Sequence, residues 1–297
     1  MNIAGIDISH ADKLLYPDDE ISKKEVVEYF YKISEYLLPF VQKRPITLKR
    51  YPDGITQEGF YNKHRPDYFP DFIEEFIVPT IQNDSEMKMT GISSKKALVY
   101  LAGQDVLELH SSLSTISSIE KPDQIIFDFD PQDNDFKKVR EVAFALKKLL
   151  DEYGITTFVK TTGSHGLHVH MPLKAHHKFD RIKEISRKIA KKLHKQYPKI
   201  TTLEQRKNKR GNKVFIDFLR NDYAMTAITP YSLRALKGAP VATPLEWEEL
   251  NDSSLNPQSY HLKNIFLRLG KKENPWKNFN QYNRHIDLQD LFEIRGD

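Results

Sequence analysis

Hydrophobic residues recur along the chain at a helical spacing in three segments. The first begins at Ser22, which can form a capping box with Glu25, and we expect Pro39 to end it. The other two cover residues 135–152 and 180–196, and each places its large apolar side chains on one face. We therefore predict three amphipathic helices, of which the third has a strongly basic opposite face.

Strands are predicted where apolar residues alternate or run together between turn residues. These segments are residues 46–51, 97–101, 124–130, 156–162, 167–173 and 214–219. Residues 105–109 fit either a short helix or an extended segment. A glycine-containing turn at residues 163–166 joins two of the strands as a hairpin. Helices and strands mixed in this order indicate an α+β fold rather than a doubly wound sheet.

The composition is that of a globular protein with a small excess of positive charge. The chain has 297 residues, of which 39% are hydrophobic and 29% are charged, and its net charge is +4. The absence of cysteine excludes disulfides, thiol nucleophiles and zinc sites built on thiolates. No apolar run approaches the roughly 18 residues of a membrane span. The N-terminus also lacks the pattern of a secretory signal, so we expect a cytoplasmic protein without membrane contact.

Two acidic residues, Asp128 and Asp130, end an otherwise apolar predicted strand. Successive strand side chains alternate between faces, so both carboxylates point to the same side. Asp217 lies in a second apolar strand. Carboxylates suit Mg²⁺ or Mn²⁺, and three that converge from two strands would form a two-metal site. An isolated Asp-x-Asp pair could instead lead into a turn and cap the next helix, but the third acid favours the metal site.

The glycine turn carries groups suited to binding an anion. Gly163 and Gly166 allow backbone N–H groups to approach an anion closely, and Thr162 adds a hydroxyl donor. His168, on the returning strand, is predicted to lie beside a polyphosphate held by this turn. A purely structural role is the alternative for each histidine, and for His170 we prefer it. The chain has no P-loop and no G-x-G-x-x-G motif, so basic side chains, the turn and metal ions would hold a triphosphate.

Three basic clusters have different expected roles. Residues 49–51 lie near Phe60 and Tyr61, and cations beside aromatic faces suit stacking on nucleic-acid bases. The basic loop at residues 206–213 leads directly into the last acidic strand, so its charge would lie near the metal site. The lysines and arginines of the helix at residues 180–196 are expected to form a solvated face.

Taken in order, these motifs resemble the polymerase domain of bacterial ligase D and its stand-alone archaeal relatives, in the archaeo-eukaryotic primase superfamily. The matching segments are residues 8–17, 44–45, 49–54, 127–131, 162–168, 214–217 and 227–234. The resemblance implies one primase-polymerase catalytic domain over residues 1–297. It would consist of an N-terminal α/β module of about residues 1–120 and a primase-like catalytic module of about residues 121–297 built on an RRM-like sheet.

The resemblance also implies roles for individual residues. Asp128, Asp130 and Asp217 would form the metal-binding catalytic triad. The residues that match the nucleotide site of the family are Lys49, His110, Thr162, His165, His168 and Arg234. Those that match its DNA contacts are Lys13 and Lys23 for a 5′-phosphate, Phe60 and Tyr61 for the template, and Arg210 close to the active site. His165 replaces the lysine usual in the family, so we expect weaker or pH-dependent triphosphate binding.

By this resemblance, the protein uses Mn²⁺ or Mg²⁺ to extend 3′-hydroxyl ends and fill short gaps, preferentially with ribonucleotides, at breaks repaired by non-homologous end joining. Its partners would be gapped or broken DNA, NTPs or dNTPs, a separate ATP-dependent ligase and a Ku-type protein. The ligase motif Lys-x-Asp-Gly is missing, because its only candidate has Tyr51 in place of the lysine. The alternatives are a primase that starts chains de novo, a non-catalytic DNA-end binding module and a two-metal nuclease.

Overall fold

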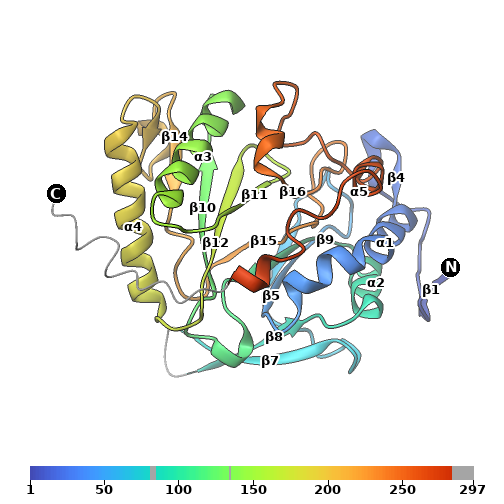
Figure 1. The fold of residues 1–297 in the computed structure, drawn as a ribbon. Coiled ribbons are helices and arrows are strands. Elements are labelled where there is room, and N and C mark those ends of the chain that lie inside the picture. The colour runs from blue at the N-terminus through green and yellow to red at the C-terminus, as the bar shows by residue number, and fades with distance from the viewer. Residues whose placement is uncertain (81–84, 134, 283–297) are drawn as a thin grey trace.

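The computed structural model describes residues 1–80, 85–133 and 135–282 (Figure 1). Its α-helices are α1 (Lys23–Val41), α2 (Lys95–Gly103), α3 (Phe136–Asp151), α4 (Phe179–Gln196) and α5 (Ile265–Leu269). Short 3-10 helices are η1 (Pro17–Asp19), η2 (Ile116–Ser118), η3 (Lys207–Lys209), η4 (Trp247–Asn251) and η5 (Phe279–Tyr282). Within the described residues, no helix is both long enough and apolar enough to cross a bilayer.

The acidic strands belong to a six-stranded sheet, here called the central sheet, with the order β13-β14-β10-β12-β11-β16. Its strands are β10 (Gln124–Asp130), β11 (Phe158–Thr161), β12 (Leu167–Pro172), β13 (Thr201–Thr202), β14 (Val214–Asp217) and β16 (Pro244–Leu245). Every pair of neighbours is antiparallel except β13 with β14. Because β10 is paired on both sides, the position of its acidic end is fixed by two ladders of hydrogen bonds.

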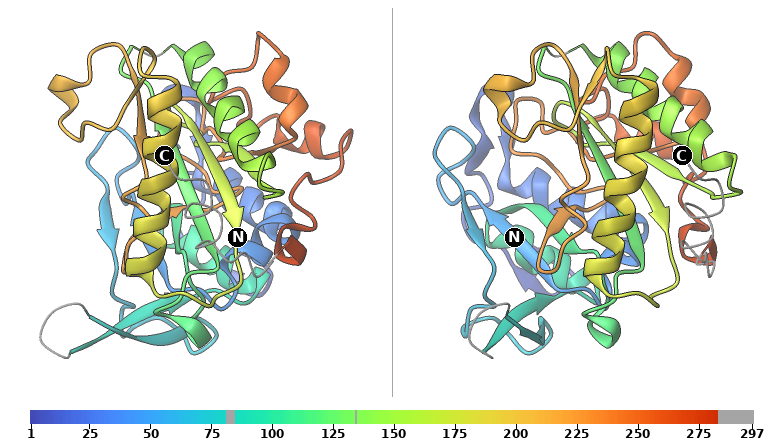
Figure 2. Two further views of the ribbon diagram at one scale, coloured as in Figure 1. Left: turned by 60° about the vertical axis from the view of Figure 1, so that its left-hand side comes forward. Right: turned by 90° about the vertical axis from the view of Figure 1, so that its left-hand side faces the viewer.

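Helices α3 and α4 lie over one face of the central sheet (Figure 2). Asp135 caps α3 through its side chain, and the apolar face of α4 buries Ile182, Ile185, Ile189 and Leu193. Phe127 and Phe129 of β10 are buried in the same core. The alternation of side chains along a strand therefore directs Asp128 and Asp130 to the opposite face, away from both helices.

A second sheet, here called the N-terminal sheet, has the order β15-β9-β5-β8-β7, with β6 paired to β5. Its strands are β5 (Ile46–Arg50), β6 (Phe60–Asn62), β7 (Glu74–Pro79), β8 (Glu86–Gly91), β9 (Val106–Ser112) and β15 (Thr226–Ile228). Two small two-stranded sheets pair β1 (Asn2–Ile3) with β2 (Ile6–Asp7) and β3 (Leu14–Tyr16) with β4 (Ile21–Ser22).

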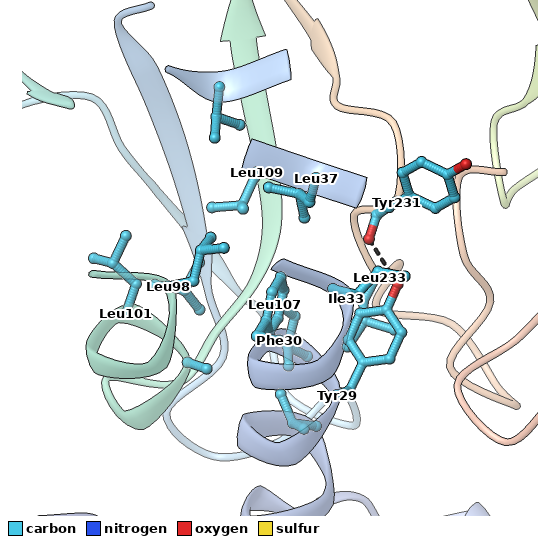
Figure 3. Close-up of a cluster of buried hydrophobic side chains, with 14 of the residues drawn as sticks. Tyr29, Phe30, Ile33, Leu37, Leu98, Leu101, Leu107, Leu109, Tyr231 and Leu233 are labelled. Atoms are coloured by element: carbon cyan, nitrogen blue, oxygen red, sulfur yellow. Dashed lines mark hydrogen bonds between the residues drawn. The ribbon is translucent and has the colours of Figure 1, made fainter. Parts of the chain in front are cut away.

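Helices α1 and α2 pack on the N-terminal sheet, and their buried side chains form a hydrophobic core with those of the sheet (Figure 3). Tyr231 and Leu233, from the second half of the chain, belong to this core, and Tyr29 donates a hydrogen bond to the Tyr231 carbonyl. Strand β15 also pairs with β9. Strand β15 and the segment that follows it up to Leu233 therefore lie with the N-terminal sheet, whereas β16, later in the sequence, belongs to the central sheet.

The α+β prediction is confirmed, and most predicted elements lie where expected. The first helix begins with the capping box of Ser22 and Glu25, but it continues through Pro39 to Val41. Pro39 lacks an N–H group and so forms no backbone hydrogen bond to the previous turn, yet the burial of Phe40 and Val41 holds this last turn in place. Of the ambiguous residues 105–109, all but Asp105 lie in strand β9, which begins at Val106.

The strand predicted at residues 97–101 is wrong, because these residues lie in helix α2. The Ser94 hydroxyl accepts a hydrogen bond from the Ala97 N–H and caps the helix. Four of the five residues in the segment are buried. A run of consecutive apolar residues has no periodicity, so the sequence pattern alone does not distinguish a buried helix from a buried strand.

The described part of the C-terminal region packs against the rest of the chain. Trp276 is buried in the N-terminal core, and its indole N–H donates to the Val159 carbonyl of the central sheet. Trp247 donates to the Thr157 carbonyl and packs on Phe144 of α3. These contacts tie the region around residues 247–282 to both sheets, whereas residues 283–297 lie outside the described residues.

Candidate active site

Asp128, Asp130 and Asp217 lie together on the face of the central sheet that is opposite α3 and α4. The register of β10 and β14 places Asp128 directly opposite Asp217, and Asp130 follows two residues later on the same face of β10. Neighbouring strands are about 4.8 Å apart. Three carboxylates from two strands therefore crowd at one place, as their positions in the sequence suggested.

Arg220 bridges two of these acids and was not identified from the sequence. Its Nε atom donates to Asp128 Oδ2 at 2.6 Å and lies 3.6 Å from Asp217 Oδ2. His168 Nε2 is 3.4 Å from the same oxygen of Asp128. The only sequence signal for Arg220 is its spacing of three residues from Asp217, and Arg220 follows β14 outside any strand, where no periodicity applies.

Crowding of like charges separates the pKa values of the three acids. Burial raises the pKa of Asp128, but interactions with His168 and with the Arg220 guanidinium outweigh it and hold this pKa well below the usual range. The charge of Asp128, together with burial, raises the pKa of Asp130 to about 7. Burial and the charge of Asp128 also raise the pKa of Asp217. The cluster therefore holds negative charge that one arginine only partly compensates.

The cluster fits a divalent cation in charge and in ligand type. Carboxylate oxygens are the ligands that Mg²⁺ and Mn²⁺ prefer, and Asp128 Oδ1 is buried without a hydrogen-bond partner. Across residues 1–80, 85–133 and 135–282, however, no three His, Cys, Asp or Glu side chains form a preformed metal-binding group. The guanidinium of Arg220 contacts Asp128 and Asp217, and so supplies positive charge beside these two acids.

A cavity of about 500 Å³ opens beside the acids, between the two sheets. The predicted site residues that line it are Tyr61, His110, Asp128, Asp130, Thr162, His165, His168, Arg210 and Arg234. Predicted residues outside its lining are Lys13, Lys23, Lys49, Phe60 and Asp217. Lys63, Lys207 and Arg220 add further positive charge to the walls. A cavity with acids at one place and cations around it suits a metal-bound polyphosphate.

The glycine turn forms one edge of this cavity and packs closely on β10. A Cβ atom on Gly166 would lie 1.9 Å from the Phe129 carbonyl oxygen, so only glycine fits there. The Thr162 hydroxyl is buried and accepts hydrogen bonds from the N–H groups of Ser164 and Gly166, each at 3.2 Å. In this structure Thr162 therefore holds the turn in shape, and the exposed His165 presents its ring to the cavity.

Glu108 is a buried carboxylate that contacts several site residues, and it was not identified from the sequence. His110 Nε2 lies 3.0 Å and Arg234 Nε 3.4 Å from its carboxylate, and the Ala235 N–H donates to it at 3.1 Å. Lys49 is its directly opposed partner on β5. Burial raises the pKa of Glu108, but the hydrogen bond from His110 and the charge of Arg234 outweigh it and lower the pKa to about 2. One carboxylate thus organises three predicted nucleotide-site residues.

Comparisons with known proteins give one consistent result. The model of the LigD primase-polymerase domain matches residues 22–276. The bifunctional non-homologous end joining protein LigD of Bacillus subtilis is 32% identical over 270 residues, which are 90% of this chain and 43% of that protein. The chain belongs to the LigD primase-polymerase domain family. The family prediction from the sequence is therefore confirmed.

Two further relatives agree with this assignment. The multifunctional LigD of Mycolicibacterium smegmatis is 30% identical over 259 residues, 86% of this chain and 33% of that protein. The polymerase domain of Mycobacterium tuberculosis ligase D, solved in complex with DNA, superposes with a TM-score of 0.85 at 26% identity and covers 94% of this chain and 99% of that one. The chain thus spans less than half the length of the LigD proteins that it matches, and corresponds to their nucleotidyltransferase domain.

Two lysines that the LigD resemblance assigned to a 5′-phosphate lie side by side. Lys23 Nζ is 3.1 Å and Lys13 Nζ is 3.9 Å from the carboxylate of Asp105. The Lys23 N–H also donates to the Lys13 carbonyl. Lys23 is buried and Lys13 is partly exposed. Asp105 therefore holds the two ammonium groups at one place, although Lys13 and Lys23 flank the small β3–β4 sheet in sequence.

The two aromatic residues predicted to contact the template are exposed. Phe60 and Tyr61 have exposed fractions of 48% and 58%, and cations cover them on one side, with Arg50 over Phe60 and Lys49 over Tyr61. Adjacent exposed rings beside cations present flat faces that can stack on bases. Arg210, in contrast, is buried, lies 3.7 Å over the ring of Phe215, and donates to the Glu204 and Gln205 carbonyls.

Proposed function

We propose that this chain is a template-directed polymerase that extends 3′-hydroxyl ends and fills short gaps, preferentially with ribonucleotides, at DNA breaks repaired by non-homologous end joining. One observation carries the proposal: Asp128 lies directly opposite Asp217, with Asp130 on the same face, beside a cavity lined by cations. Membership in the LigD primase-polymerase family, whose M. tuberculosis relative was solved with DNA, supports it.

Asp128, Asp130 and Asp217 are the residues that would hold divalent ions, Mn²⁺ or Mg²⁺. When bound, such ions lower the pKa of the primer 3′-hydroxyl and stabilise the charge of the leaving pyrophosphate. The protein supplies a fixed arrangement of ligands on two neighbouring strands, so little reorganisation precedes the reaction. Arg220 keeps the acids charge-compensated until then, because it contacts both Asp128 and Asp217.

The nucleotide triphosphate would lie in the cavity against the glycine turn. His168 presents its Nε2 side to the acids, and the exposed His165 and Arg234 add donors along the cavity wall. Glu108 positions Arg234 and His110 through the contacts described above. Lys49 lies behind these residues, opposite Glu108, and Thr162 maintains the turn. The side chains therefore bind and orient the nucleotide, and no side chain is needed as a proton acceptor.

The DNA would cover the exposed aromatic pair and reach the paired lysines. Phe60 and Tyr61 stack on template bases, and Lys13 and Lys23 bind a downstream 5′-phosphate. Arg210, which lines the cavity but is held by Phe215 and two backbone carbonyls, adds positive charge where the DNA reaches the active site. Because residues 1–297 carry no Lys-x-Asp-Gly motif, we assign nick sealing to a separate ATP-dependent ligase. The family resemblance assigns end binding to a Ku-type protein.

A gap-extension assay tests the proposal. The purified chain is mixed with a gapped duplex that carries a downstream 5′-phosphate, with NTPs or dNTPs, and with Mn²⁺ or Mg²⁺ in separate reactions. We expect extension by the length of the gap and faster incorporation of ribonucleotides. Product on an unprimed template would identify a primase that starts chains de novo. Binding without extension would identify a DNA-end binding module, and shortened primers a nuclease.

A further inference from the structure

Four residues form a row across the face of the central sheet that carries the acids. Lys160 of β11 lies directly opposite His168 of β12, His168 lies opposite Asp128 of β10, and Asp128 lies opposite Asp217 of β14. Directly opposed residues of antiparallel strands point to the same face. Lys160 therefore begins a row that ends at the acid cluster, with His168 as its nearest neighbour across the strands.

Lys160 is an unusual residue in this position. Its side chain is fully buried, and its Nζ atom has no hydrogen-bond partner among the described residues. Burial lowers the pKa of Lys160 well below its ordinary value, and the charge of Asp128 opposes this effect only in part. A buried lysine costs free energy that a methionine or leucine of similar size would not, so its presence requires a role for the amino group.

The histidines beside Lys160 each leave one ring nitrogen without a partner. His168 directs Nε2 to Asp128, at 3.4 Å, and its buried Nδ1 has no partner. His170 Nδ1 contacts the Gln124 Oε1 atom at 2.8 Å, and its buried Nε2 has no partner. The contacts to oxygen acceptors place a proton on His168 Nε2 and on His170 Nδ1. A neutral imidazole then has a lone pair on the other nitrogen, so both unpartnered atoms are acceptors.

Lys160 is the donor that this set lacks. The Lys160 amino group has N–H donors in either protonation state. His168 Nδ1 and His170 Nε2 carry no proton in the tautomers given above, so they can only accept hydrogen bonds. Separations beyond direct hydrogen-bond distance inside proteins are commonly bridged by one water molecule. The row of side chains therefore supplies a donor on one side of His168 and a carboxylate acceptor on the other.

We propose that Lys160 is a positioning residue that donates to His168 Nδ1 through one water molecule, and so fixes the His168 proton on Nε2, where it faces the acids and the nucleotide cavity. The tautomer assignment is independent of catalysis, whereas its use in triphosphate binding rests on the proposed function. Without this donor, His168 can transfer its proton to Nδ1 or rotate, and Nε2 then ceases to be a donor toward the cavity.

Lys160→Met separates this role from a structural one. Methionine has a similar length but no donor, and it removes a buried polar group that has no hydrogen-bond partner among the described residues, so we expect thermal stability to stay the same or rise. We expect the affinity for ATP with Mg²⁺, measured without DNA, to fall roughly fivefold, the effect of one lost hydrogen bond. If Lys160 served stability alone, Lys160→Met would lower the thermal stability and leave the affinity for ATP with Mg²⁺ unchanged.

The direct test is nitrogen NMR of histidine-labelled protein, without metal and DNA. Long-range ¹H–¹⁵N spectra distinguish the two neutral tautomers, and His168→Gln identifies the signal of His168. In the wild type we expect His168 to be protonated on Nε2 with a hydrogen-bonded Nδ1. In Lys160→Met we expect a mixture of tautomers or loss of the Nδ1 hydrogen bond. Lys160→Gln, which retains an N–H donor, should restore part of the wild-type pattern.

Thr161→Val is the matched control, since Thr161 is equally buried on the same strand but points to the other face. It should leave the His168 signal unchanged. An unchanged His168 tautomer in folded Lys160→Met overturns the proposal even if the chain is a polymerase. A changed tautomer in a chain that fails the gap-extension assay supports the role of Lys160 and rejects the proposed function.

Discussion

Asp128 lies directly opposite Asp217 on adjacent antiparallel strands, and Arg220 contacts the carboxylates of both. Two carboxylates in this position repel each other, so each raises the free energy of the other in the absence of a cation. The fold accepts this cost at a site where β10 is held by neighbours on both sides. Such strain between like charges is expected where a bound cation is part of the function.

Replacement of Asp128 by Ala or Asp217 by Asn should abolish gap extension. Loss of one of three carboxylate ligands weakens the metal site, and we expect a decrease of at least about 100-fold in rate. The same variants should lose the increase in melting temperature that Mn²⁺ gives the wild type, which reports on metal binding independently of activity. Asp151→Asn, at an exposed acid on α3, is the control. Full extension by either site variant would contradict the assignment of the acids.

Asp130→Asn should stabilise the metal-free protein at alkaline pH and leave it unchanged near pH 4. The charge of Asp128 and burial raise the pKa of Asp130 to about 7, whereas an unfolded aspartate has a pKa of about 3.9. The folded state then binds the proton more tightly, so wild-type stability falls as pH rises from about 4 to 7. We expect a gain of about 1–3 kcal/mol for the variant at pH 8.

Urea unfolding in EDTA at pH 4.5 and pH 8 measures this difference. The variant should show a smaller loss of unfolding free energy between the two pH values than the wild type. Equal losses in both proteins would show that Asp130 is not held near the charge of Asp128 in solution. Asp151→Asn again serves as the control, and it should behave as the wild type.

Glu108→Gln should weaken nucleotide binding more than it slows the chemical step. Glutamine keeps the shape of the side chain but leaves Arg234 without its buried counter-charge and His110 without its ionic acceptor. We expect a roughly tenfold rise in KM for the nucleotide and a loss of about 2 kcal/mol in unfolding free energy at pH 7. Because the pKa of Glu108 is lowered to about 2, its stabilising effect is present above about pH 4 and is lost as pH falls toward 2.

The control for this prediction is Glu75→Gln. Glu75 also lies on a strand and contacts two cations, Arg65 at 3.7 Å and Lys88 at 3.0 Å, but it does not line the cavity. Steady-state kinetics on a gapped duplex should show an unchanged KM for this variant. An equal rise in KM for both variants would mean that a general loss of stability, rather than the position of Arg234 and His110, causes the effect.

Replacement of both Lys13 and Lys23 by Gln should reduce affinity for a gapped duplex only when the downstream end carries a 5′-phosphate. Each lost phosphate contact should decrease the slope of log affinity against log salt by up to ~0.9. Fluorescence anisotropy at several salt concentrations measures both quantities. Asp105→Asn, which removes the acid that both lysines contact, should have the opposite effect on affinity. An equal loss of binding on phosphorylated and unphosphorylated DNA would reject a specific phosphate site.

Local patterns predicted the elements that carry the acids and the glycine turn. Strand β10 and helices α1, α3 and α4 follow from alternation, helical spacing and capping residues. The same reasoning failed for α2, where burial on nearly all sides removes the periodic signal. Glu108 could have been found, because a glutamate in an apolar strand two residues before His110 shares its face.

The sequence by itself determined that Asp128 and Asp130 share one face of a strand and that Asp217 lies in a second apolar strand, because side-chain alternation is a local property of the chain. It also identified the family through motifs spread over most of its length. Only the tertiary structure decided that Asp217 lies opposite Asp128, that Glu108 holds Arg234 and His110, and that Lys160 begins the row leading to the acids. Strand order and register depend on contacts between distant segments, and no local pattern specifies them.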